Sequence, residues 1–222
     1  MKMLNNSFKG FPKEMPTFLF ELRFHNTIED QAENVEKYKK LIIEPLRLLY
    51  GALIPTITSL DYPFDIKPAR CISTPYTDRR YFPSAPLKEY MYIRFKQFGK
   101  DENVPGLYFD MGAQHYSYGL RIYKQTTDGI KKLREKIFER PEFYSDQLYQ
   151  VIADGFSVHG ELYKRDHHPK LPDCRAKEIL NRKYFHIGKI RPVHDNVFTS
   201  NLAKEIAEGF VSVSKILDMM GI

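Results

Sequence analysis

The stretch Met91-Tyr92-Ile93-Arg94-Phe95-Lys96 decides the fold class of this 222-residue chain. Apolar and polar side chains alternate along it, which is the pattern of a β-strand with one face in the core. Over about the first sixty residues, by contrast, the apolar residues recur at helical spacing. The period changes after Pro63 and Pro68, so a sheet is predicted to begin in the middle of the chain.

Two further alternating segments follow, over 107–111 and 116–122. Gly112-Ala113 lies between them and predicts a turn, so we expect consecutive antiparallel strands. The segment from Gly155 to Gly160 is typical of a short return strand.

Start signals for helices lie on both sides of these strands. Before the strands, the signals are Thr17, Thr27 and Pro45. After them, the signals are Asp128 or the Thr126-Thr127 pair, and Pro141. Helices that flank a run of strands predict an α+β fold, in which N-terminal and C-terminal helices pack on an antiparallel sheet from the middle of the chain.

The last helix has the clearest pattern. Its apolar residues recur on one stripe, formed by Leu202, Ile206, Phe210, Val213 and Leu217. We expect this helix to close the domain against the core. Because no repeat or Ser/Gly-rich linker marks a boundary, we expect a single domain over residues 1–222, with 1–16 more loosely ordered.

Composition limits the class of protein. Hydrophobic residues make up 42% of the chain and charged residues 28%, with 15 Tyr and 16 Phe, which is typical of a compact globular protein rather than a disordered one. The N-terminus lacks the apolar run of a signal peptide, and no segment is expected to reach the roughly 18 apolar residues of a membrane span. We therefore expect a soluble cytoplasmic protein with no membrane partner.

The net charge of +6 allows a polyanionic partner without requiring one. Residues 61–140 hold fifteen Lys and Arg against ten Asp and Glu, whereas 141–222 hold eleven of each. The excess of positive charge therefore lies in the middle of the chain.

The densest chemical cluster is Tyr76-Thr77-Asp78-Arg79-Arg80-Tyr81, followed by Pro86-Leu87-Lys88. Arg79 and Arg80 carry planar groups that bind a phosphate or carboxylate through two hydrogen bonds, and Lys88 adds a third cation. Asp78 is the candidate catalytic residue, because it could orient an arginine or accept a proton. A structural alternative stays open, in which Asp78 pairs with a neighbouring arginine and holds a loop in place.

Polar residues on the predicted strands form a second candidate surface. Tyr92, Arg94 and Lys96 share one face of their strand, and Arg121 and Tyr123 share one face of theirs. If these faces coincide, the sheet presents a basic, aromatic surface that could stack a base or hold a phosphate. A solvated sheet face shows the same pattern and is the commoner case.

No cofactor or metal is expected. Cys71 and Cys174 lack zinc-site spacing, so buried, reduced thiols are predicted. The segment 159–168 holds three histidines and a glutamate in a spacing that matches no metal motif, and its more interesting members are Lys164 and Arg165. No nucleophile motif or glycine-rich phosphate loop occurs, so the sequence leaves open whether the protein is an enzyme.

From roughly Phe18 to Phe185 the chain resembles the uncharacterised bacterial family catalogued as domain of unknown function 2461. The resemblance rests on ordered blocks, namely Phe18-Leu19 with His25-Asn26, Tyr76 to Tyr81 with Pro86-Leu87-Lys88, Pro105 to Tyr108 with Gly119-Leu120, and Gly160-Glu161-Leu162 with Lys164 and Lys183. The family's Trp-Phe pair is absent and Leu87 replaces its tyrosine, which indicates a divergent member. The resemblance favours Asp78, Arg80, Lys88, Lys164 and Lys183 as site residues and implies no activity.

Two functions from different classes remain. The first is a pocket that binds a small phosphate- or carboxylate-bearing ligand through cations drawn from Arg79, Arg80, Lys88, Arg121, Lys164 and Lys183. The second is a non-enzymatic binding protein whose basic aromatic sheet face, with Tyr92, Tyr108 and Tyr123, meets an acidic protein or nucleic acid, a possible but less favoured partner. A third, structural possibility is that the charged blocks only fasten loops. The sequence determines neither strand order nor oligomeric state.

Overall fold

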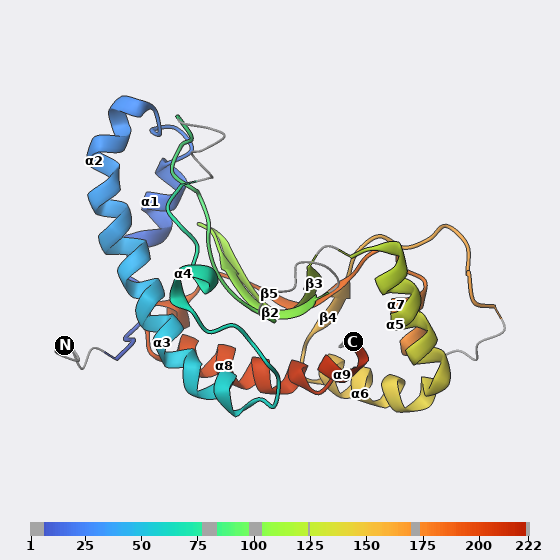
Figure 1. Cartoon of the computed structure of the whole chain (residues 1–222). Helices are drawn as coiled ribbons and strands as arrows, with labels where there is room; N and C mark the ends of the chain where they lie inside the picture. Colours follow the sequence, from blue (N-terminus) through green and yellow to red (C-terminus); the bar gives the residue numbers. More distant parts are fainter. Residues whose placement is uncertain (1–6, 77–83, 98–103, 124, 170–173, 221–222) are drawn as a thin grey trace.

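A computed structural model describes residues 7–76, 84–97, 104–123, 125–169 and 174–220 of the chain. Within these ranges, five strands form one antiparallel sheet in the order β1-β2-β3-β5-β4 (Figure 1). The strands are β1 (Met91–Lys96), β2 (Val104–Met111), β3 (His115–Tyr123), β4 (Ser157–His159) and β5 (His186–Pro192).

Helices precede and follow the first three strands. The N-terminal helices are α1 (Met15–Glu21), α2 (Ile28–Tyr38), the π-helical turn η1 (Lys39–Ile43), α3 (Glu44–Ser59) and α4 (Pro68–Cys71). The later helices are α5 (Thr127–Glu139), α6 (Pro141–Ala153), α7 (Ala176–Leu180), the 3₁₀ turn η2 (Asp195–Phe198), α8 (Asn201–Ser214) and α9 (Leu217–Met220). The predicted α+β fold is confirmed.

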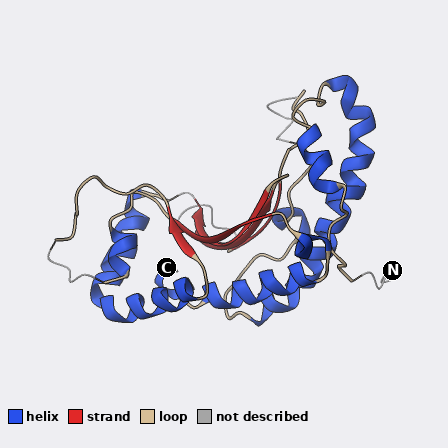
Figure 2. Cartoon of the chain, turned by 180° about the vertical axis from the view of Figure 1, so that it is seen from behind, coloured by secondary structure: helices blue, strands red, loops and turns tan. Residues whose placement is uncertain are grey.

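The helices are distributed unevenly around the sheet. Helices α3, α6, α8 and α9 lie along one side of it (Figure 1). Helices α1 and α2 rise at one end and α5 and α7 at the other, as the view from behind also shows (Figure 2). The opposite side of the sheet is crossed by no helix of the described chain, and we call it the open face.

The core lies between the sheet and α8. Register places Ile93 opposite Phe109 and Phe95 opposite Leu107, and all four side chains are fully buried. The Phe95 ring meets the Phe210 ring of α8 edge to face, with centroids 6.2 Å apart. Aromatic pairs of this kind stabilise a core beyond the apolar area that they bury.

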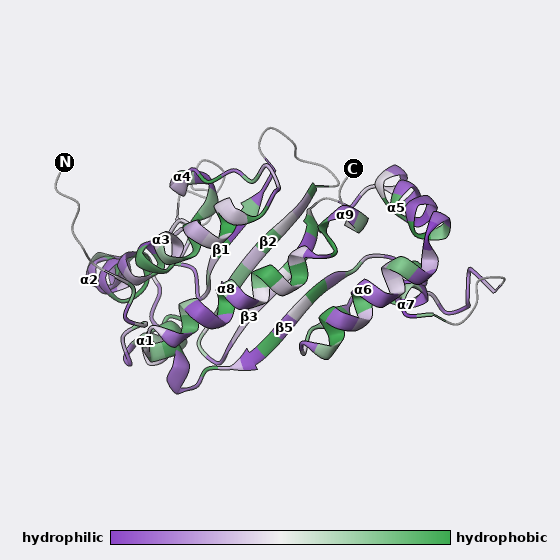
Figure 3. Cartoon of the chain, turned by 90° about the horizontal axis from the view of Figure 1, so that it is seen from below, coloured by the Kyte–Doolittle hydropathy of each residue, from purple (hydrophilic) through white to green (hydrophobic). Residues whose placement is uncertain are grey.

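Gly209 sets the distance between α8 and the sheet. A Cβ atom at this position would lie 2.3 Å from Cε2 of Tyr118 and 3.3 Å from Cζ of Phe156. Only a residue without a side chain therefore allows α8 to approach β3 so closely. Figure 3 shows α8 lying across the strands, with hydrophobic and hydrophilic residues alternating along it.

Helix starts largely follow the predicted signals. Thr27 caps α2 in a reciprocal pair of hydrogen bonds with Asp30, and Thr126 caps α5. Pro45 and Pro141 lie in the first turns of α3 and α6. The predicted start at Thr17 is wrong, because α1 begins at Met15 with a proline in its first turn.

Strand β5 is an element that the sequence analysis does not predict. After Gly188, the polar and apolar residues of β5 lie on the opposite faces from those expected. Lys189 and Arg191 lie on the helix side, and Ile190 is exposed on the open face. Nζ of Lys189 lies 4.7 Å from the centre of the Phe156 ring, and Arg191 pairs with Glu205 of α8. Tertiary contacts therefore hold the polar residues of β5 on the helix side.

One helix is long and apolar enough to cross a membrane, the continuous run Ile28–Ser59. This corrects the expectation that no segment reaches such a length. Leu46, Leu49 and Leu53 of this run are fully buried in the core, and a buried core helix meets the same criterion. Of the apolar window of this run, 44% is buried inside the fold.

Two helical glycines give a matched test of this packing. We expect Gly209→Ala to lower the free energy of unfolding, since overpacking costs about 1–3 kcal/mol and the gain in helix propensity returns about 1 kcal/mol. Gly51→Ala on α3 meets no atom within 4 Å, so it should raise the same free energy by about 0.5–1 kcal/mol. Urea denaturation measures both changes, and effects of the same sign would contradict the close approach at Gly209.

Candidate functional site

Strand register arranges the side chains of the open face in three transverse rows. From β1 toward β4 the rows are Tyr92, Asp110, Ser117 and Ile190; then Arg94, Tyr108, Gly119, Gly188 and Ser157; then Lys96, Gly106, Arg121, His186 and His159. The polar faces that the sequence predicts on β1 and β3 therefore coincide.

Tyr108 forms the floor in the middle of this face. A Cβ atom at Gly188 would lie 2.3 Å from its hydroxyl oxygen, so the tyrosine occupies the space that this glycine leaves. Cζ of Arg121 lies 4.0 Å from the centre of the Tyr108 ring, a cation–π distance. Tyr108 is only 1% exposed, so Arg121 and not the ring faces solvent.

Asp110 holds Arg121 in this position. Nη2 of Arg121 lies 3.1 Å from Oδ2 of Asp110. Burial raises the pKa of Asp110, while the charges of Arg121 and Arg94 oppose the rise. The second carboxylate oxygen, Oδ1, is buried and has no hydrogen-bond partner within the described ranges.

Lys88 and Arg94 lie over a single aromatic ring. Nζ of Lys88 is 5.4 Å and Cζ of Arg94 is 3.8 Å from the centre of the Tyr92 ring. Nζ of Lys88 also donates to the neutral hydroxyl of Thr74 at 3.4 Å. Burial lowers the pKa of Lys88, and the nearby charge of Arg94 lowers it further. We call Lys88, Arg94 and Arg121 the cationic cluster.

Asn26 holds the segment that carries Lys88. Its Nδ2 donates to the backbone oxygen of Leu87 at 2.9 Å, and its Oδ1 accepts from the backbone nitrogen of Leu87 at 3.0 Å. The backbone nitrogen of Lys88 donates to the oxygen of Pro75 at 2.8 Å. The sequence blocks around Asn26 and Leu87 thus form one structural unit that positions a cation of the cluster.

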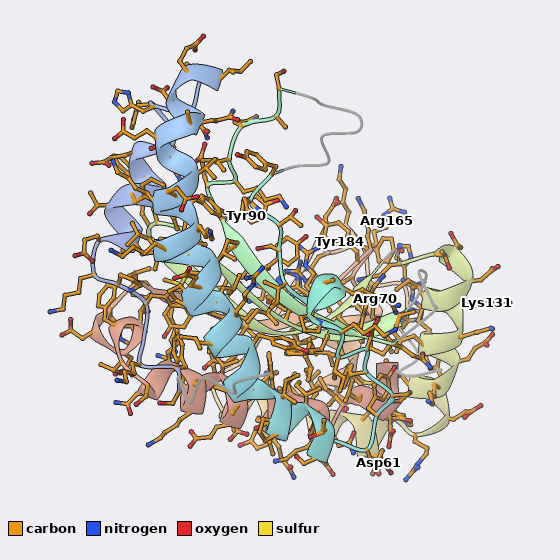
Figure 4. The ribbon with its side chains drawn as sticks, turned by 60° about the vertical axis from the view of Figure 1, so that its left-hand side comes forward. Asp61, Arg70, Tyr90, Lys131, Arg165 and Tyr184 are labelled. Atoms are coloured by element: carbon orange, nitrogen blue, oxygen red, sulfur yellow. The ribbon has the colours of Figure 1, made fainter. Side chains whose placement is uncertain are left out.

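A hollow of about 260 Å³ adjoins the cluster at the turn between β2 and β3. Its lining consists of Tyr90, Arg94, Asp110, Met111, Gly112, His115, Tyr116, Ser117 and Ile190. Tyr90 is half exposed and lies just before β1 (Figure 4). Arg94 belongs to both features, so the hollow and the cationic cluster are continuous.

Two histidines stack at the other end of the open face. The rings of His159 and His186 have centroids 4.9 Å apart, and their planes differ by 20°. The rings of Tyr108 and His186 meet edge to face, with centroids 6.2 Å apart. Burial lowers the pKa of His186 to about 4, and the charges of Arg121, His159 and Arg182 contribute. We call His159 and His186 the histidine pair.

The structure brings together some of the cations that the sequence proposes. Lys88 and Arg121 lie on the open face, whereas Asp78, Arg79 and Arg80 lie outside the described residues. Lys183 is exposed and pairs with Glu161, which raises the pKa of the lysine. Lys164 is exposed in the segment that follows β4. The described contacts of Lys183 therefore lie apart from the cationic cluster.

The sequence analysis places Arg94 on a candidate sheet face, but it does not include Arg94, Asp110 or the histidine pair among the residues of the anion pocket. Alternation places Arg94 on a polar strand face, and that signal was available. Asp110 has a comparable signal, because it alternates with Phe109 and Met111. The meeting of the two histidines depends on pairing between β4 and β5, which local periodicity does not report.

Thiol and metal chemistry find little support in the described part of the chain. Cys71 and Cys174 are free, and Cys71 is buried. Sγ of Cys71 donates to the backbone oxygen of Asp65 at 3.0 Å, and burial raises the pKa of the thiol to about 12. No three His, Cys, Asp or Glu side chains gather as metal ligands among the residues that the structure describes.

Comparison with known proteins adds a family. Residues 14–219 match a family model described as "Conserved hypothetical protein (DUF2461)". The match covers nearly the whole chain, so it includes every strand and all residues of the cationic cluster. Searches of curated proteins and of solved structures gave no significant match.

The two bonds of Asn26 give a test of how Lys88 is held. Asn26→Ala should lower the free energy of unfolding by about 2 kcal/mol, because the backbone groups of Leu87 lose both partners. Asn34→Ala is the matched control, since Asn34 makes one exposed bond to the oxygen of His25 and should cost about 0.5 kcal/mol. Chemical denaturation compares them, and equal losses would argue against the clamp.

The histidine pair predicts a dependence of stability on pH. The folded-state pKa of His186 lies below the ordinary value, so its contribution is complete above about pH 6.5 and is lost as the pH falls toward about 4. His186→Gln should reduce this acid-induced loss by about 1 kcal/mol between about pH 7.5 and about pH 5, a value discounted for the partial exposure of the ring.

The measurement is urea denaturation at about pH 7.5 and about pH 5. His115→Gln serves as a control at an exposed position and should keep the wild-type response. A His186→Gln protein that loses as much stability as wild type would show that His186 is not buried in its neutral form.

Proposed function

We propose a function for this chain, which belongs to the DUF2461 family of conserved hypothetical proteins: it binds a small phosphate- or carboxylate-bearing ligand on the open face of its sheet. The placement of Lys88 and Arg94 over the ring of Tyr92 carries this proposal. Arg94 also lines the adjoining hollow, so an anion held by these cations can extend into it.

The charge balance of the site favours an anion. Lys88, Arg94 and Arg121 bring three positive charges to the open face, and Asp110 pairs with Arg121. Lys88 and Arg94 repel each other enough to lower the pKa of the lysine. An oxyanion between them would relieve this repulsion and accept charge-assisted hydrogen bonds.

Preorganisation supports the same proposal. Tyr92 and Tyr108 support the two guanidinium groups at 3.8 and 4.0 Å from their ring centres. An arginine stacked on a ring has already lost much of its rotamer freedom, so less entropy is lost when it binds a ligand. Asp110 adds to this effect, because it holds Arg121 at 3.1 Å.

The hollow limits the size of the ligand. Its volume of about 260 Å³ is near the lower end of the range for small-molecule sites. The lining offers the hydroxyl groups of Tyr90 and Ser117 and the ring of His115 for polar contacts. The hollow therefore suits a small polar part of an anionic ligand better than a bulky apolar group. The proposal concerns binding and assigns no reaction.

The alternative is a binding protein whose aromatic sheet face meets nucleic acid or an acidic protein. It requires rings that are free to stack, among them Tyr92 and Tyr108. Tyr108 is buried beneath Arg121, and Arg94 lies over Tyr92. A guanidinium group therefore covers one face of each ring, where a base would have to stack. This arrangement favours the binding of a small anion over the binding of nucleic acid.

Protection against heat by inorganic phosphate tests the proposal. Phosphate should raise the melting temperature of the wild-type protein, because a ligand that binds only the folded state stabilises it by about 2.7 kcal/mol at a hundredfold excess over Kd. Arg94→Gln and Lys88→Gln should each weaken binding by about tenfold or more, the cost of one charge-assisted hydrogen bond.

Lys131→Gln is the matched control. Lys131 is an exposed lysine of α5 that points outward at the edge of the molecule (Figure 4), so its substitution should leave phosphate protection unchanged. Absence of protection in wild type would contradict the proposal. Equal protection of wild type, Arg94→Gln and Lys88→Gln would do the same.

A further inference from the structure

The histidine pair lies in a row of the sheet that contains no acidic residue. From β1 to β4 that row consists of Lys96, Gly106, Arg121, His186 and His159. Gly106 leaves a gap in it, and every other member is a cation or can become one. Arg121 belongs both to this row and to the cationic cluster, so the histidine pair is continuous with the proposed site.

The surroundings of His186 keep it neutral when no ligand is present. Arg121 faces it from β3, His159 from β4, Tyr108 from β2 and Arg182 from the segment before β5. None of these groups is a carboxylate, and Nη1 of Arg182 donates to the backbone oxygen of Gly160 at 2.6 Å. A proton on His186 would therefore meet the positive charges of Arg121 and Arg182.

We infer that the histidine pair, with Arg121, is a second anion subsite that takes up a proton when it is filled. An anion beside the pair would offset the repulsion from Arg121 and Arg182, and a protonated imidazole would donate to it. This inference rests on the proposed function, because it gives the ligand of the open face a second anionic group.

The spacing of the strands sets the separation of the two anionic groups. Arg94 lies on β1 and His186 on β5, three strands further across the sheet. With about 4.8 Å between neighbouring strands and an offset of two residues along them, about 6.6 Å, the two subsites are about 16 Å apart. Arg121 lies between them on β3 and can contact the middle of the molecule. The ligand class is thus an extended polyanion, such as a linear oligophosphate or a metabolite with a phosphate at each end.

Binding should tighten as the pH falls. The free protein holds His186 neutral near pH 7, and binding shifts it toward the protonated form. A process that takes up a proton is favoured at lower pH by linkage. Binding of orthophosphate at the cationic cluster alone would lack this dependence on the histidine pair.

Isothermal titration with orthophosphate, tripolyphosphate and a longer linear polyphosphate tests the inference. The wild-type protein should bind the longer polyphosphate at least about tenfold more tightly than tripolyphosphate, since the longer ligand gains one charge-assisted contact. This advantage should grow between about pH 7.5 and about pH 6, across the ordinary pKa of histidine. Titration in two buffers with different ionisation enthalpies should show net proton uptake for the longer chain.

His159→Gln and His186→Gln, alone and together, supply the comparison. They should remove the advantage of the longer chain, its pH dependence and the proton uptake, while orthophosphate protects them as it protects wild type. His25→Gln, at an exposed position outside the hollow and the histidine row, should behave as wild type. The measurements in two buffers need no variant, so they test the inference even if a substitution impairs folding.

The outcomes separate the two proposals. Absence of orthophosphate binding in wild type would overturn the proposed function, and the further inference with it. Orthophosphate binding without an advantage for the longer chain, or an advantage that survives both histidine substitutions, would overturn the further inference alone. Loss of orthophosphate binding in a folded His186→Gln protein would also overturn it, because the histidines would then belong to a single site.

Discussion

The register of the antiparallel strands is the constraint on which the rest of the structure depends. A shift by one residue would move Phe109 to the open face and Tyr108 to the helix side. The helix side is filled by aromatic rings that contact α8, so only one register buries them. The same register aligns the cations on the other face. The site is therefore a consequence of how the core packs.

Polar atoms beneath the sheet are satisfied by a network that ties β3 to α8. The hydroxyl groups of Tyr116 and Tyr118 donate to Glu205 at 3.0 and 3.1 Å, and Arg191 of β5 pairs with the same carboxylate at 3.1 Å. Burial raises the pKa of both tyrosines, which keeps them protonated as donors. This network holds β3, β5 and α8 in one arrangement. It therefore also makes the open face of the sheet rigid.

The two faces use aromatic residues in different ways. Beneath the sheet, rings such as Phe95 and Phe210 pack against each other. On the open face, Tyr92 and Tyr108 support the guanidinium groups of Arg94 and Arg121. A cation stacked on a ring keeps its charge accessible while its side chain is held. An open, basic surface of this kind suits the capture of an anion.

Local sequence by itself determined the types of the longer helices and of β1 to β4, because alternation and capping act over a few neighbouring residues. It indicated the strand of Arg94, the cap at Thr27 and the placement of Arg121 on a polar face. Only the tertiary structure decided that β5 enters the sheet beside β3 and brings His186 to His159. Pairing between distant strands depends on the combined burial of the whole core, and no local pattern in 186–192 reports it.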